Sequence, residues 1–78
     1  MKIEILSPSK SLFEGEVTSV TVPGKDGSMG FLNNHAPLIT VLKAGDVKLK
    51  TESGEEKSFA VKGGVVEVQN NKVIILAD

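Results

Sequence analysis

His35 is the only histidine in this chain of 78 residues, and the sequence contains no cysteine. A small hydrolase would need a base such as His35 beside an activated serine, but no serine stands in the G-x-S-x-G context of a nucleophile elbow. A metal site lacks a second histidine and any thiolate. We therefore expect His35 to hydrogen-bond its own loop next to Pro37, and we expect no catalytic residue, metal site or cofactor.

The glycines at positions 24, 27 and 30 invite comparison with a phosphate-binding loop. Their spacing differs from G-x-G-x-x-G, and no helical pattern follows whose N-terminus could receive a phosphate. Close turns explain them better, because Asp26-Gly27 is a common hairpin pair. The carboxylates fall mostly on the polar phase of strand patterns or in turns, so we interpret them as a solvated surface rather than an acid–base pair.

The composition describes one domain, residues 1–78, with a net charge of -1 and three phenylalanines as its only aromatic residues. A nucleic-acid surface would show a clustered basic patch or a stacking platform, and the sequence has neither. No signal peptide and no apolar run of about 20 residues is present. We expect a soluble cytosolic protein or a peripheral subunit.

Apolar and polar residues alternate with the period of β-strands along most of the chain. Val17 is out of phase with Val20 and Val22, which predicts a bulge near Thr18-Ser19, with Gly15 as another candidate position. The expected strands are residues 2–6, 12–17 and 20–22 on either side of the bulge, 38–42, 47–51, 57–61, 65–69 and 72–76.

Turn signals separate these strands at intervals of about 8–12 residues, a spacing typical of a sandwich or a barrel. Glu52-Ser53-Gly54-Glu55 reads as a hairpin loop, and Asn70-Asn71 can adopt the positive φ angles of a tight turn. No segment shows a helical period. The predicted fold class is all-β, a small β-sandwich of about eight to ten short strands without a helical domain.

A turn-rich loop is expected between the strands that end near Pro23 and begin at Leu38. Its large apolar residues Met29, Phe31 and Leu32 either fold back into the core or face a partner, and core is the default expectation. The run Leu38–Leu42 is almost continuously apolar, which is typical of a strand covered on both sides or lying against a partner.

Several segments in this part of the chain resemble the N-terminal domain of the epsilon subunit of F-type ATP synthase, called delta in mitochondria. The resemblance covers the whole chain in one colinear register. The combination of an H-A-P-L segment with a G-G-x-x-E-V segment at this spacing is specific. The matching segments are Val22-Pro23-Gly24, Gly27-Ser28-Met29-Gly30-Phe31-Leu32, His35-Ala36-Pro37-Leu38, Gly63-Gly64-Val65-Val66-Glu67-Val68 and the closing Leu76-Ala77-Asp78.

The resemblance implies a β-sandwich of about ten strands at the foot of the rotating central stalk, on the cytoplasmic face of a bacterial inner membrane. It implies a non-catalytic subunit that holds the gamma subunit and touches the polar loops of the c-ring. The family pattern often has an acidic residue at the position of Ser28. The implied gamma contacts are Ser7, Leu38, Ile39, Thr40 and Leu76, and the implied c-ring contacts are Asp26, Ser28, Met29, Phe31 and His35.

Family members usually continue into a helical hairpin that can inhibit ATP hydrolysis and in some members binds ATP. If Asp78 is the natural end, both properties are expected to be absent. The main alternative is a free-standing module that binds a peptide strand or another ligand, and the shortage of aromatics argues against a carbohydrate platform. For the gamma contact, we expect Leu38→Asp to leave the domain folded and to weaken binding.

Overall fold

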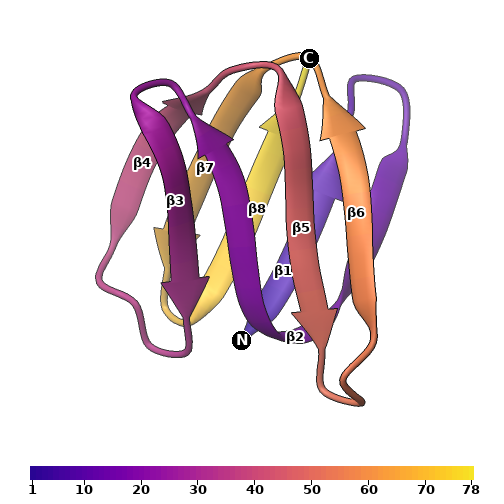
Figure 1. Ribbon diagram of the computed structural model, residues 1–78, viewed down its shortest axis with the longest axis vertical. Coiled ribbons are helices and arrows are strands. Elements are labelled where there is room, and N and C mark those ends of the chain that lie inside the picture. Colours follow the sequence, from indigo (N-terminus) through magenta and orange to yellow (C-terminus); the bar gives the residue numbers. More distant parts are fainter.

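The computed structural model describes residues 1–78 and contains eight β-strands (Figure 1). No element in it is a helix of the length and apolarity needed to cross a membrane. The all-β prediction is confirmed, with a strand number at the lower end of the expected range. The strands are β1 (Lys2–Leu6), β2 (Ser11–Gly24), β3 (Gly27–Leu32), β4 (Leu38–Leu42), β5 (Gly45–Thr51), β6 (Glu56–Val61), β7 (Gly64–Gln69) and β8 (Lys72–Ala77).

The strands form two layers that face each other across the core (Figure 1). The first sheet has the order β4-β7-β8-β1 and is completed by the first half of β2, which pairs with β1. The second sheet consists of β3, the second half of β2, β5 and β6. Strands β1 and β8 run parallel, and every other pairing is antiparallel.

Strand β2 is 14 residues long and belongs to both sheets. Its pairing with β5 shifts register between Val17 and Ser19, where the strand bends from one layer into the other. The bulge predicted near Thr18-Ser19 is therefore confirmed. Gly15 is not the site of the bulge, because it pairs regularly with Ile3 of β1.

The core between the layers contains only apolar side chains, which come from the inward positions of the alternating strands. On the side where β6 faces the first half of β2, the rings of Phe13 and Phe59 lie 5.5 Å apart and cover the gap. The core residues are Met1, Ile3, Ile5, Val17, Val20, Val22, Phe31, Leu42, Val47, Leu49, Val61, Val66, Val68, Val73, Ile75 and Ala77.

The prediction of a loop after Pro23 is wrong over most of the first half of that segment, because residues 27–32 form strand β3. Strands β2 and β3 make a hairpin whose turn is only Lys25 and Asp26. Glycine and serine disfavour strands, so the local pattern hid an element that depends on its pairing with β2. Of the three glycines in this stretch, only Gly27 has a positive φ, of 140°.

Candidate functional site

Strand β4 presents alternate residues to the core and to solvent. Leu42 is buried, and the half-buried Leu38 packs against the core. Between them, Ile39 is 67% exposed and Val41 is 52% exposed. The continuous apolar run therefore supplies more apolar surface than the core uses, in agreement with the sequence-based expectation.

Neighbouring strands extend this apolar surface across the first sheet. Val41 lies opposite Val65 of β7, Val65 lies opposite Leu76 of β8, and Leu76 lies beside Leu6 of β1. Leu76 is 52% exposed and Val65 is 37% exposed. We call the outward-facing residues Leu6, Ile39, Val41, Val65, Ile74 and Leu76 the apolar face.

The outer surface of the second sheet is mostly polar by contrast, and its exposed large apolar residue is Leu32 at the end of β3, 67% exposed, for which the default expectation of a core position is wrong. The outward positions of this sheet include Thr21, Lys48 and Ser58, which lie in one row across β2, β5 and β6. A shallow hollow on this side is lined mainly by polar residues, including Ser28 and Asp46. The difference between the two outer surfaces makes the apolar face the candidate surface for contact with a partner.

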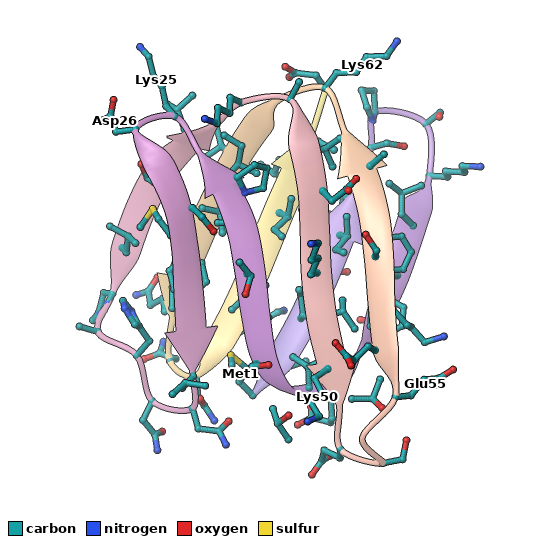
Figure 2. The ribbon with its side chains drawn as sticks, in the orientation of Figure 1. Met1, Lys25, Asp26, Lys50, Glu55 and Lys62 are labelled. Atoms are coloured by element: carbon teal, nitrogen blue, oxygen red, sulfur yellow. The ribbon has the colours of Figure 1, made fainter.

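The β2–β3 hairpin projects at one end of the sandwich, with Lys25 and Asp26 at its tip (Figure 2). Its base is joined to the end of β4 by two backbone hydrogen bonds. The amide of Lys25 donates to the carbonyl of Val41 at 2.9 Å, and the amide of Lys43 donates to the carbonyl of Pro23 at 2.9 Å. The hairpin is thus held directly against a strand of the apolar face.

His35 lies in the loop between β3 and β4, at the opposite end of β3 from the hairpin tip (Figure 1). Its Nδ1 is 2.7 Å from the carbonyl oxygen of Ala36, and its ring makes an edge contact with Phe31 at 5.0 Å between centroids. The prediction that His35 hydrogen-bonds its own loop is confirmed. No group of three or more histidine, aspartate or glutamate side chains comes together in a way that could hold a metal ion.

Residues 1–78, the whole chain, match the family described as "ATP synthase, Delta/Epsilon chain, beta-sandwich domain". The chain belongs to this family. It is 47% identical over 77 residues to the ATP synthase epsilon chain of Dichelobacter nodosus (strain VCS1703A), covering 99% of this chain and 54% of that relative. It is 46% identical over 77 residues to the ATP synthase epsilon chain of Chlorobium limicola, covering 99% of this chain and 88% of that relative. This epsilon-type domain therefore spans about half the length of the first relative.

Two solved structures share the fold at low sequence identity. A chain of the Euglena gracilis mitochondrial ATP synthase (OSCP/F1/c-ring, rotational state 1) superposes with a TM-score of 0.90 at 22% identity, covering 96% of this chain and 48% of that one. A chain of the Tetrahymena thermophila mitochondrial ATP synthase central stalk/c-ring superposes with a TM-score of 0.79 at 23% identity, covering 99% of this chain and 62% of that one. These similarities show a common sandwich.

The gamma contacts predicted for this epsilon-type domain do not all face outward. Ile39 and Leu76 lie on the apolar face, whereas Thr40 and Leu38 point inward. Leu38→Asp would place a charge against the core, so the expectation that this variant stays folded is not supported. Ser7 follows β1, and its hydroxyl donates to the Lys10 carbonyl at 3.1 Å.

Other members of the apolar face were missed in the sequence. Val65 precedes Val66 and Ile74 precedes Ile75, so each belongs to a short continuous apolar run, whereas Leu76 was already among the predicted gamma contacts. The same signal drew attention to residues 38–42, and applying it to β7 and β8 finds the additional members. Leu6 has the same signal, because it follows Ile5 directly and so stands where the alternation of β1 would place a polar residue.

The five predicted c-ring contacts are not brought together by the fold. Asp26 and Ser28 are exposed at the hairpin end, whereas His35 lies at the other end of β3 (Figure 1). Met29 packs against the core, and Phe31 is only 1% exposed. Phe31 therefore cannot offer its side chain to a partner. The contacts of Asp26, Ser28 and His35 with the c-ring stay predictions, with the first two at the hairpin end.

Proposed function

We propose that this domain is a non-catalytic part of the ATP synthase rotor that links the gamma subunit to the c-ring. In this proposal the apolar face binds gamma and the β2–β3 hairpin tip touches the c-ring loops. Ion-driven rotation of the ring is then passed to gamma. The domain acts as a peripheral component on the cytoplasmic face of a bacterial inner membrane.

The apolar face is the observation that supports this proposal most directly. Ile39, Val41 and Leu76 each have more than half of their surface exposed, at 67%, 52% and 52%. Burying a large aliphatic side chain completely is worth about 1.5–3 kcal/mol, so covering the exposed part of each contributes about 1–2 kcal/mol. Three such residues in adjacent strands together contribute about 3–6 kcal/mol, which offsets part of the roughly 4–15 kcal/mol lost on association.

The connection between the two surfaces supports a coupling role. A coupling part must transmit displacement from one partner to the other, so its two binding surfaces have to move as one body. The hydrogen bonds from Lys25 to Val41 and from Lys43 to Pro23 join the hairpin base to β4. A displacement of the hairpin is therefore passed to the strand that carries Ile39 and Val41 without crossing a flexible linker.

The absence of a catalytic role is also part of the proposal. His35 already hydrogen-bonds Ala36 and packs on Phe31, which supports a structural function for the only histidine. Its ring nitrogen Nδ1 contacts a backbone carbonyl and not the carboxylate that would orient a catalytic base. We expect the catalytic sites to belong to other subunits of the complex.

The proposal is tested by calorimetric titration, at a stated salt concentration, of the 78-residue chain into the purified gamma subunit of the same ATP synthase. We expect saturable binding with one domain per gamma subunit. Capture of detergent-purified c-ring by the gamma–epsilon pair, and not by gamma alone, tests the hairpin contact. A folded chain that does not bind gamma would contradict the proposal and favour the free-standing binding module.

A further inference from the structure

We propose that Glu67 is the specificity anchor of the apolar face and pairs with a cationic side chain, an arginine or a lysine, of the gamma subunit. The inference rests on the proposed function, because it specifies the chemistry of the gamma surface that covers this face. Glu67 is a half-buried residue in β7, which lies between β4 and β8 in the first sheet.

Three of the four nearest neighbours of Glu67 on the outer surface of the sheet are apolar, and the fourth is Gln69 in its own strand. Across the strands it lies opposite Ile39 of β4 and opposite Ile74 of β8. Along its own strand the next residue on the same side toward the hairpin end is Val65, which belongs to the row with Val41 and Leu76. A partner that covers the apolar face therefore covers Glu67 as well.

No cation within the domain neutralises Glu67. The structure contains two ion pairs, Lys57–Glu55 at 3.6 Å and Lys72–Glu4 at 3.9 Å. Lys72 is the diagonal neighbour of Glu67 in the sheet, since it lies opposite Gln69, but its Nζ is directed to Glu4. In this row across the sheet, Glu4 is paired with Lys72, whereas Glu67, the carboxylate that lies between Ile39 and Ile74, is left without an intramolecular ion pair.

Water can hydrate Glu67 in the free domain, but a docked partner removes that water. An ionised carboxylate that loses its hydration without gaining a cation or hydrogen-bond donors is strongly unfavourable. A guanidinium compensates best, because it donates two parallel hydrogen bonds to a carboxylate and its flat surface packs well beside aliphatic side chains. The gamma surface should therefore present one cation surrounded by apolar residues.

This arrangement would give the interface a fixed register. Aliphatic contacts tolerate sliding of one surface over another, whereas a charge pair in an apolar surrounding is satisfied in only one position. A rotor part must not slip relative to gamma. The single carboxylate among Ile39, Ile74 and Val65 would provide that positional constraint.

The isosteric variant Glu67→Gln tests the inference by the sign of its effect. If a gamma cation pairs with Glu67, calorimetric affinity for gamma falls by about 10- to 100-fold, and the dependence of affinity on salt becomes weaker. If no cation is present, removing the charge removes a desolvation cost, so affinity is unchanged or rises. The matched control is Glu52→Gln in the exposed β5–β6 hairpin, which should leave affinity and salt dependence unchanged.

Further measurements separate the possible failures. Wild-type chain that does not bind gamma would defeat the proposed function itself. Binding that is weakened by Ile39→Ala but not by Glu67→Gln would retain the apolar contact and overturn the ion pair. Where Glu67→Gln does weaken binding, replacing single arginines or lysines of gamma identifies the cation. Replacing that cation weakens binding of the wild-type domain, but it weakens binding of the Glu67→Gln domain only slightly, because the ion pair is already lost.

Discussion

Leu38 and Ile39 are adjacent in β4 but face opposite sides of the first sheet, so substituting each of them tests the assignment of the apolar face. Leu38 packs against the core, and Ile39 is 67% exposed. We expect Leu38→Ala to lower stability with little effect on gamma binding by the folded chain. We expect Ile39→Ala to do the reverse.

The magnitudes follow from burial. Removing a fully buried leucine side chain costs about 2–5 kcal/mol, so the half-buried Leu38 should cost about 1–2 kcal/mol, which lowers the melting temperature of a domain this size by about 5–15 °C. For Ile39, two-thirds of the side chain remains to be covered by a partner. Its loss should weaken gamma binding by about 1–2 kcal/mol, or about 5- to 30-fold, and change stability by no more than about 0.5 kcal/mol.

Thermal unfolding followed by circular dichroism measures the first effect, and calorimetric titration into gamma measures the second. The titrations are made well below the melting temperature of the less stable variant, so that both chains are folded. Equal affinities of Ile39→Ala and wild type for gamma would refute the assignment of the apolar face. A large loss of stability in Ile39→Ala would show instead that this side chain belongs to the core.

Four further substitutions give distinct expected outcomes. Gly64 has a φ of 137°, and a Cβ there would collide with the backbone carbonyl of Leu76. Gly64→Ala should therefore lower the free energy of unfolding in urea by more than about 3 kcal/mol. In the control variant Gly30→Ala, the nearest atom would be 3.8 Å from the Cβ, so the free energy of unfolding should change by no more than about 0.5 kcal/mol. Phe31→Ala should cost about 3–5 kcal/mol, and a stable variant that loses only c-ring capture would contradict its place in the core. Asp26→Lys should alter c-ring capture without changing the melting temperature, and unchanged capture would argue against the hairpin contact.

Local sequence patterns were sufficient to predict most of the strands. The boundaries of β1 and β4 agree with the alternation and the apolar run in the sequence, since both patterns are local. Asn70 and Asn71 have φ angles of 53° and 57°, as expected for the tight turn between β7 and β8. Such features are encoded by a few consecutive residues and need no knowledge of the partner strands.

Strand β3 and the apolar face could not be predicted in the same way. Gly27 to Leu32 contains two glycines and a serine, and it is extended because Val20 and Val22 of β2 pair with Phe31 and Met29. The apolar face depends on the register between β4, β7 and β8, which no single strand encodes. The position of Glu67 among apolar residues has the same origin.

The passage of β2 from one sheet to the other determines how the sandwich responds to mechanical load. One end of β2 leads into the hairpin tip, and the other end is paired along Lys2–Leu6 of β1. Tension applied at the tip therefore acts along the strand axis and loads the hydrogen bonds to β1 and β5 in shear. Bonds loaded in this way share the force and must break together, unlike those of an unzipping hairpin. Strand β2, which belongs to both sheets, thus makes the domain stiff along the axis between its two ends.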